Sequence, residues 1–263
     1  MCGRSPTVRA VKFSANLGYL WTELDLVDAI HAAARAGFDA VECHWPYAVA
    51  PAVVDAALRD TGLPMISLNT APGDAATGDF GLAALPGREA QARALIDQAL
   101  DYAVAVAAGK VHVMAGNAHG DAAAATFRAN LEYACERAAP HGLTILVEPL
   151  NRFDAPGYFL RDSLQASALI EAIGAPNLRL MFDCYHVERT EGDTLRRLQT
   201  LLPIIGHVQI ASVPRRGEPD RGELDYRPVM RWLNEAGYCA PIGAEYRPAG
   251  ATGDSLGWME RLR

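Results

Sequence analysis

"TILVEPLN", residues 144–151, is the stretch of this sequence that decides the fold. Its first four residues, Thr144 to Val147, are β-branched or aliphatic, without alternating polar side chains. Such a run is typical of a strand that is buried on both faces of a parallel sheet. Glu148 and Pro149 follow at once, and a proline cannot continue a hydrogen-bonded ladder. The pattern therefore predicts a buried parallel strand that carries a carboxylate at its carboxyl end.

Seven other segments of the chain have the same strand-like character, and helix-like segments separate them. These strand candidates are residues 11–17, 40–45, 64–70, 110–116, 178–186, 204–212 and 241–248. Between them lie alanine- and leucine-rich stretches with helical periodicity, such as residues 23–37 and 87–109, which we expect to end at Gly37 and Gly109. Eight alternating βα units predict an α/β protein that consists of a single (β/α)8 TIM barrel.

The length of the chain agrees with one barrel domain. Its 263 residues match the size of about 250 residues that is usual for this architecture. We expect residues 1–10 to form a flexible N-terminal extension. We expect residues 11–263 to form one barrel, because no linker or low-complexity tract divides this range. The longest irregular stretch, residues 71–87, follows the third strand. A loop of that size in a compact domain is usually a lid or a binding loop.

Composition excludes several classes of partner. The chain has 24 basic and 31 acidic residues and a net charge of −7, without a lysine- or arginine-rich run, so we expect no nucleic-acid partner. No apolar segment has the length of a membrane span or the pattern of a signal peptide, so we expect no membrane partner. Five cysteines at scattered spacings suit a reducing cytoplasm. We therefore expect a cytoplasmic enzyme acting on a small molecule, and self-association stays open.

Four late strands place an oxygen-bearing side chain at or near their carboxyl ends: Glu148, Asp183, Gln209 and Glu245. The carboxyl ends of all barrel strands open on one face, so these side chains share a site. Three carboxylates and an amide oxygen suit Mg²⁺ or Mn²⁺. A divalent ion would also let clustered carboxylates stay ionised, whereas alone they would raise one another's pKa. Each acid by itself is more simply a helix cap or an arginine partner, and Glu42 on the second strand stays unassigned.

At these residues the sequence resembles the hydroxypyruvate isomerases, within the xylose isomerase-like TIM barrels. The motifs that carry the resemblance are "KFSANL" (12–17), "TGDFGLAALPGRE" (77–89), "VEPLNRFDAPGY" (147–158), "FDCYH" (182–186), "HVQIA" (207–211), "PRRGEPDRGELDY" (214–226) and "EYRP" (245–248). The resemblance implies four metal ligands, which are Glu148, Asp183, Gln209 and Glu245. It also implies that Glu148 and Glu245 are the catalytic acid and base.

The same resemblance suggests three substrate-binding residues. His186 and Arg216 match positions that touch substrate in related ketose epimerases. Asp154 falls six residues after Glu148, where sugar epimerases of the superfamily carry a glutamate, although its side chain is shorter. Arg216 offers a planar fork for a substrate carboxylate, which a lysine does not reproduce. A solvated arginine beside Arg215 is the competing interpretation.

The implied reaction interconverts hydroxypyruvate and tartronate semialdehyde (2-hydroxy-3-oxopropanoate) through an enediolate, with bound Mg²⁺ or Mn²⁺. One proton moves between C3 and C2, which suits two glutamates that exchange the roles of acid and base. A 2-oxotetronate isomerase or a related sugar epimerase would use the same residues. A metal-dependent lyase or hydrolase on the same barrel is the more distant alternative. The acidic charge and the amide of Gln209 argue against a DNA-cleaving hydrolase.

Overall fold

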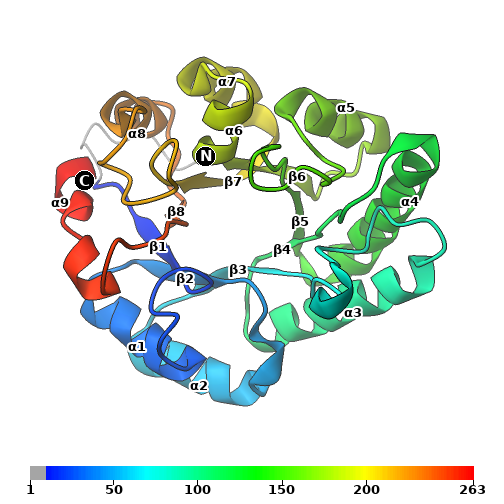
Figure 1. Ribbon diagram of the computed structural model, residues 1–263. Helices are drawn as coiled ribbons and strands as arrows, with labels where there is room; N and C mark the ends of the chain where they lie inside the picture. The colour runs from blue at the N-terminus through cyan, green and yellow to red at the C-terminus, as the bar shows by residue number, and fades with distance from the viewer. Residues whose placement is uncertain (1–9) are drawn as a thin grey trace.

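A computed structural model describes residues 10–263 and shows eight parallel strands that close into a barrel in chain order (Figure 1). All eight predicted strands are present, but several end earlier than predicted, and residues 184–186 of the candidate 178–186 begin a helix. The strands are β1 (Phe13–Asn16), β2 (Ala40–Cys43), β3 (Met65–Asn69), β4 (Lys110–His112), β5 (Thr144–Val147), β6 (Leu178–Asp183), β7 (Ile205–Ile210) and β8 (Ile242–Ala244). Most of the expected flexible extension, residues 1–9, lies outside the described residues.

An outer ring of helices covers the barrel (Figure 1). The helices are α1 (Leu26–Arg35), α2 (Pro51–Thr61), α3 (Glu89–Ala105), α4 (Gly120–Ala138), α5 (Ser163–Ile173), α6 (Cys184–Thr190), α7 (Thr194–Leu201), α8 (Tyr226–Glu235) and α9 (Trp258–Leu262). Gly37 follows α1 with a φ of 80°, which is the left-handed conformation that a helix-ending glycine commonly takes. The prediction that Gly109 ends the next long helix is wrong. Helix α3 ends at Ala105, because Ala107 turns the chain with a φ of 53° and Ala108 N–H bonds to Ala103.

Strand register places two of the predicted site residues, Asp183 and Gln209, at the same level of the barrel. Asp183 on β6 lies opposite Gln209 on β7, and Gln209 lies opposite Gly243 on β8. Elsewhere in the barrel, the adjacent strands β1 and β2 place Asn16 next to Glu42. Because side chains alternate along a strand, register decides which of them share a level inside the barrel.

The loop of residues 71–87 is tied to the barrel rather than free over its mouth. It contains a short 3-10 turn, η2 (Ala75–Thr77), and Leu82 to Ala84 are buried. The Ala84 N–H donates to the Ala115 carbonyl at 2.7 Å. Arg88 binds both carboxylate oxygens of Asp79, at 2.6 and 2.9 Å, which closes the loop on itself.

Two further findings bear on the sequence expectations. Among residues 10–263, no helix is both long enough and apolar enough to cross a membrane. The four cysteines in that range are free thiols, and three of them, Cys43, Cys135 and Cys184, are buried as small hydrophobic side chains.

Candidate active site

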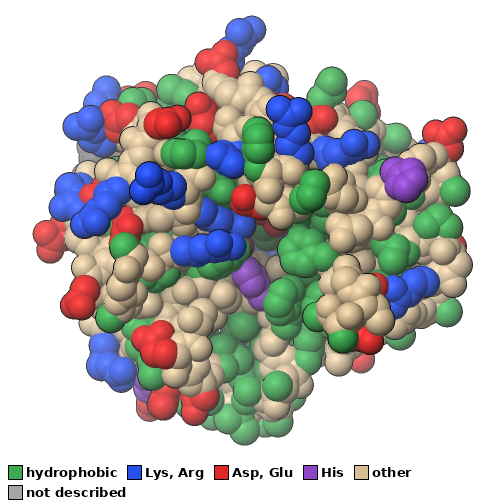
Figure 2. All heavy atoms as spheres, viewed as in Figure 1, with side chains coloured by type: hydrophobic (Ala, Val, Ile, Leu, Met, Phe, Trp, Pro, Cys, Tyr) green, Lys and Arg blue, Asp and Glu red, His purple; other side chains and the backbone are tan. Residues whose placement is uncertain are grey.

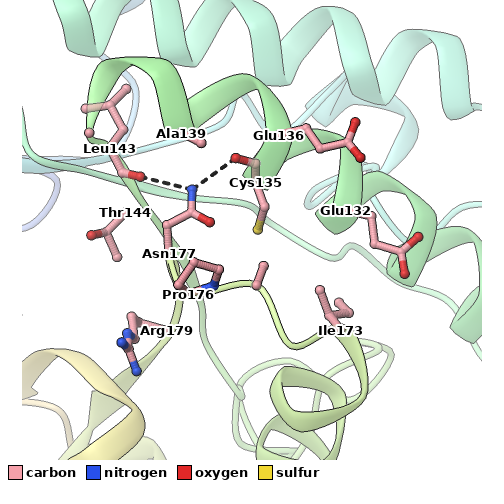
Figure 3. Close-up of a pocket in the computed structure, with 12 residues that line it drawn as sticks. Glu132, Cys135, Glu136, Ala139, Leu143, Thr144, Ile173, Pro176, Asn177 and Arg179 are labelled. Atoms are coloured by element: carbon pink, nitrogen blue, oxygen red, sulfur yellow. Dashed lines mark hydrogen bonds between the residues drawn. The ribbon is translucent and has the colours of Figure 1, made fainter.

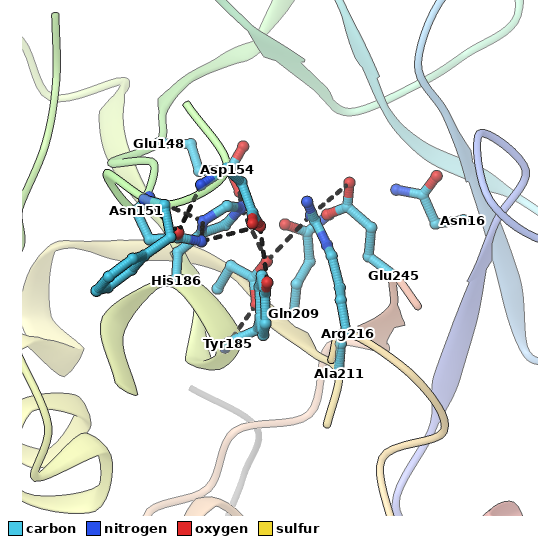
Figure 4. Close-up of polar contacts among 12 residues, drawn as sticks. Asn16, Glu148, Asn151, Asp154, Tyr185, His186, Gln209, Ala211, Arg216 and Glu245 are labelled. Carbon is cyan, nitrogen blue, oxygen red and sulfur yellow. Dashed lines mark hydrogen bonds and ion pairs between the residues drawn. The ribbon is translucent and has the colours of Figure 1, made fainter. Parts of the chain in front are cut away.

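The carboxyl ends of the late strands bring together the four residues that the sequence singled out. Asp183 ends β6. Gln209 lies near the end of β7, and Glu148 and Glu245 directly follow β5 and β8 (Figure 4). All four side chains are buried, with at most 6% of any residue exposed. On the same face the molecule is hollowed at its centre, and a histidine and basic side chains border the hollow (Figure 2).

Buried oxygens without partners distinguish this cluster from an ordinary polar core. Within the described part of the chain, Glu148 Oε1, Gln209 Oε1 and Glu245 Oε2 have no hydrogen-bond partner. Buried polar atoms are nearly always hydrogen-bonded, so three orphaned oxygens in one place indicate a ligand that binds oxygen. A hard divalent cation such as Mg²⁺ or Mn²⁺ prefers such ligands. The residues present therefore fit the predicted metal.

Asp183 offers one of its two carboxylate oxygens, Oδ2, to a cation. Its Oδ1 accepts a hydrogen bond from the Tyr185 N–H at 2.8 Å and so caps α6. Its Oδ2 lies 3.7 Å from His186 Nε2. The atoms that Glu148, Asp183 and His186 could offer to a cation lie within 4.8 Å of one another.

The electrostatics of the cluster favour a cation. Burial, together with the charges of Glu245 and Asp183, raises the pKa of Glu148 well above its ordinary value. Burial raises the pKa of Asp183 to about 7, although Arg216 opposes the change. Without a cation the two carboxyls therefore retain protons far above the usual range. A bound cation removes this cost because it stabilises the ionised forms.

Arg216 is the positive side chain of the site. It is 8% exposed, whereas Arg215 is exposed, so the loop after β7 directs only Arg216 into the barrel mouth. Its Nη2 lies 3.2 Å from Glu245 Oε1 and 3.5 Å from Asp183 Oδ2. Its guanidinium carbon lies 4.8 Å from the ring centre of Tyr19 and 5.1 Å from that of Tyr185. The aromatic faces hold the guanidinium in place by cation–π contacts.

His186 is held in one tautomer. Its Nδ1 accepts a hydrogen bond from the Asn151 N–H at 3.0 Å. Burial lowers the pKa of His186 well below its ordinary value, so the ring is neutral near pH 7 and its proton lies on Nε2. That Nε2–H lies 4.0 Å from Glu148 Oε1. His186 is therefore arranged to donate a hydrogen bond into the site and is poorly suited to bind a metal through Nε2.

Asp154 occupies a different position from the other candidates. Its side chain is exposed, and its Oδ2 accepts hydrogen bonds from Tyr185 Oη at 2.7 Å and Asn151 Nδ2 at 3.1 Å. Asp154 lies beside the cluster and ties Tyr185 to the loop after β5 (Figure 4). Through Tyr185 it supports the aromatic face against which Arg216 packs.

Two histidines at the barrel mouth were not predicted from the sequence. His44 Nε2 lies 2.9 Å from Glu245 Oε1, and His112 Nδ1 lies 3.7 Å from Glu148 Oε2. His112 is 2% exposed, and burial and His44 lower its pKa to about 3, so the ring is neutral. Their positions along the chain could have identified them, because His112 ends β4 and His44 directly follows β2.

A separate pocket of about 640 Å³ opens at the other end of the strands (Figure 3). Thr144 at the start of β5 and Arg179 near the start of β6 line it. The Nδ2 of Asn177 is paired there, because it donates to the carbonyls of Cys135 and Leu143 at 3.0 and 3.3 Å. The pocket contains none of the orphaned oxygens that mark the strand-end cluster, and active sites of TIM barrels lie at the carboxyl ends.

Comparisons with known proteins match the fold and almost the whole chain. The model of the family described as "Xylose isomerase-like TIM barrel" matches residues 30–262. A 2-oxo-tetronate isomerase of Cupriavidus necator is 45% identical over 95% of this chain and 97% of its own. A putative hydroxypyruvate isomerase of Homo sapiens is 40% identical, over 95% and 94%. A crystal structure from Brucella melitensis, titled AP endonuclease, family 2, is 39% identical with a TM-score of 0.93, and the match covers 96% of this chain and 99% of that one.

Proposed function

The chain belongs to the xylose isomerase-like TIM barrel family and is an isomerase, and on that premise we propose that it moves a proton between C3 and C2 of a short 2-oxo acid. The substrate class is a 2-oxo acid with a hydroxyl group on C3, and the intermediate is the enediolate that both isomers share. The observation that carries the proposal is the group of orphaned oxygens on Glu148, Gln209 and Glu245.

Glu148, Asp183, Gln209 and Glu245 are the proposed ligands of a divalent cation, Mg²⁺ or Mn²⁺. The cation would supply Lewis-acid stabilisation for the negative charge that develops on the two substrate oxygens. Asp183 is the ligand with the clearest structural constraint, because Tyr185 N–H holds its other oxygen.

Glu148 and Glu245 are the proposed proton carriers. One removes the proton from C3 and the other delivers a proton to C2, with the roles exchanged in the reverse direction. Each glutamate has a histidine beside it, His112 for Glu148 and His44 for Glu245. The contact of His44 with Glu245 is a hydrogen bond of 2.9 Å and fixes the position of that carboxylate.

Arg216 and His186 are the proposed substrate-binding residues. The guanidinium of Arg216 is held between two aromatic rings and would bind the substrate carboxylate in a planar, charge-assisted contact. The Nε2–H of His186 would donate to a substrate oxygen. Asp154 acts indirectly in this proposal, through its hydrogen bond to Tyr185.

Hydroxypyruvate and 2-oxo-tetronate are the two candidate substrates. The chemistry at C2 and C3 is the same in both, and the four-carbon acid carries a CH₂OH group in place of one C3 hydrogen. The resemblance to the hydroxypyruvate isomerases and the 40% identity to a protein named putative hydroxypyruvate isomerase support hydroxypyruvate. The 45% identity to a protein named 2-oxo-tetronate isomerase supports the four-carbon acid as a second candidate.

A parallel assay of purified protein tests the proposal and separates the candidates. We expect isomerisation of at least one of the two acids, complete loss of activity after exhaustive chelation, and recovery with Mg²⁺ or Mn²⁺. The acid with the higher kcat/KM is then the preferred substrate. Full activity in the chelated protein would contradict the metal mechanism, and inactivity toward both acids would contradict the substrate class.

An abasic-site DNA duplex belongs in the same assay, because one similar structure carries an endonuclease title. We expect no cleavage. A DNA-cleaving enzyme needs a basic surface for phosphate contacts, whereas this chain has a net charge of −7.

A further inference from the structure

Glu42 is a buried carboxylate that the proposed reaction does not use. It is 1% exposed and lies on β2 inside the barrel. Its Oε1 accepts hydrogen bonds from Gln209 Nε2 at 2.8 Å and Asn16 Nδ2 at 3.0 Å. Its Oε2 is bonded to His207 Nε2 at 2.6 Å and Ser14 Oγ at 3.1 Å. Four side chains from β1 and β7 therefore converge on one carboxylate.

Both oxygens of Glu42 act as hydrogen-bond acceptors. Gln209 and Asn16 donate to Oε1 through their amide nitrogens, and Ser14 donates to Oε2 through its hydroxyl group. An amide nitrogen can only donate, and an amide oxygen can only accept. The contact of Gln209 with Glu42 must therefore be made by its Nε2.

That restriction decides how Gln209 is oriented. A glutamine amide has a donor end, Nε2, and an acceptor end, Oε1, of nearly the same size. Glu42 accepts only from Nε2, so Oε1 is left at the opposite side of the amide. This Oε1 is buried and has no partner in the described part of the structure. Gln209 lies opposite Asp183, another of the proposed ligands, in the pairing of β7 with β6.

Gly243 makes the contact between Glu42 and Gln209 possible. It lies on β8, directly opposite Gln209 on β7. A Cβ at this position would lie 2.6 Å from Glu42 Oε1 and 2.7 Å from Gln209 Cγ, closer than real Cβ atoms approach other atoms. The missing side chain leaves the space in which a carboxylate from β2 reaches an amide on β7.

We infer that Glu42 is a positioning residue, which turns the oxygen of Gln209 toward Glu148, Asp183 and Glu245 and the NH₂ group away from them. The inference rests on the proposed function, in which Gln209 is a metal ligand. An amide that turned around would present its NH₂ hydrogens to the cation, which repels them. Glu42 thus converts a side chain with two similar ends into a dedicated oxygen ligand.

The test measures Mn²⁺ affinity by calorimetry on protein stripped of metal. In the Glu42→Gln variant the new amide can donate as well as accept, so Gln209 is no longer held in one orientation. We expect Mn²⁺ affinity to fall about 10- to 100-fold, the usual effect of losing a residue that orients a metal ligand. Ser14→Ala is the matched control. It removes a hydrogen bond from Oε2 of the same carboxylate, leaves the Gln209 contact intact, and should keep wild-type affinity.

A double variant separates positioning from a general loss of structure. In a Gln209→Ala background the amide is absent, so adding Glu42→Gln should lower Mn²⁺ affinity no further. An equal loss in both backgrounds would overturn the inference, because Glu42 would then act without Gln209. Unchanged affinity in Glu42→Gln alone would overturn it too.

Two measurements keep the inference testable if Glu42→Gln does not fold. Gly243→Ala crowds the same contact from β8 and should weaken Mn²⁺ binding to a similar degree. A crystal structure of the wild-type protein with Mn²⁺ should show Gln209 bridging Glu42 and the ion, and a side chain that does not reach the ion would refute the inference. A wild-type protein that binds no Mn²⁺ would instead refute the metal site of the proposed function.

Discussion

At the scale of single residues, the two glutamates at the ends of β5 and β8 carry the proposed proton transfer. Replacing Glu148 or Glu245 by Gln keeps an oxygen for the cation but removes the base. We expect kcat to fall by about 10²–10⁴-fold for each variant, while metal content falls much less. The double variant should cost far less than the product of the two single losses.

Exchange of the substrate C3 hydrogen in deuterated water assigns the two roles. A variant that keeps the C3 base exchanges this hydrogen without completing isomerisation, and its intact glutamate is then the base. If both variants retain near wild-type turnover with metal bound, the two-glutamate mechanism is wrong.

Two neighbouring arginines provide a matched pair of variants. Arg216 is buried between two aromatic rings, whereas Arg215 is exposed. Arg216→Ala should lower kcat/KM, because a charge-assisted hydrogen bond to the substrate carboxylate is lost. The loss corresponds to about 2 kcal/mol or more of transition-state stabilisation. Arg215→Ala should leave kcat/KM unchanged. The opposite ranking in steady-state kinetics would show that the substrate carboxylate binds elsewhere.

At the scale of elements, the loop of residues 71–87 depends on one ion pair. The hydrogen bond from Arg88 lowers the pKa of Asp79 below its ordinary value of 3.8. A lowered carboxylate pKa stabilises the folded loop above pH 3.8, and this stabilisation is lost as the pH falls through the folded-state pKa. At neutral pH the pair is therefore fully formed.

Asp79→Asn should loosen this loop at neutral pH without unfolding the barrel. We expect faster proteolysis or hydrogen exchange within residues 71–87 and a higher KM if the loop binds substrate. Asp220→Asn, which removes the partner of Arg261 elsewhere on the surface, is the control. Equal protection of the loop in wild type and Asp79→Asn would show that its buried residues, not the ion pair, hold it.

At the scale of the whole molecule, the acid cluster should make stability depend on pH and metal. The pKa of Asp183 is raised to about 7 in the folded protein, and that of Glu148 is raised as well. Between pH 4 and 7 the folded state then binds more protons than the unfolded state, so the metal-free protein loses stability as the pH rises.

Saturating Mn²⁺ should reverse this loss, and by most at pH 8, because the cation binds the ionised carboxylates only in the folded state. At 100 times the dissociation constant the gain is about 2.7 kcal/mol. For a chain of this size that corresponds to a rise in Tm of roughly 5–10 °C. Asp183→Asn should flatten the pH dependence and reduce the response to Mn²⁺ in thermal unfolding. A Tm independent of both pH and Mn²⁺ would contradict the description of a metal-binding cluster of carboxyl groups with raised pKa values.

The sequence by itself determined the barrel and the shared location of Glu148, Asp183, Gln209 and Glu245. Both follow from the order of elements along the chain. Buried strands alternate with helices, and the carboxyl ends of parallel strands meet on one face of a barrel. The end of α3 was missed because Ala107 adopts a left-handed conformation that only the surrounding chain stabilises. Glycine is the residue that adopts this conformation most readily, so an alanine gave no sign of a helix end.

Only the tertiary structure decided which partners each polar side chain has. Arg216 rather than Arg215 enters the site because the loop after β7 turns one of them inward. His44 and His112 come beside the two glutamates from strands that are distant in sequence. Glu42 could not be assigned from its neighbours along the chain, because its hydrogen bonds come from the adjacent strand β1 and from β7, which is not adjacent to β2. Such contacts depend on barrel closure and strand register, which place side chains in three dimensions and leave no pattern in a single stretch of sequence.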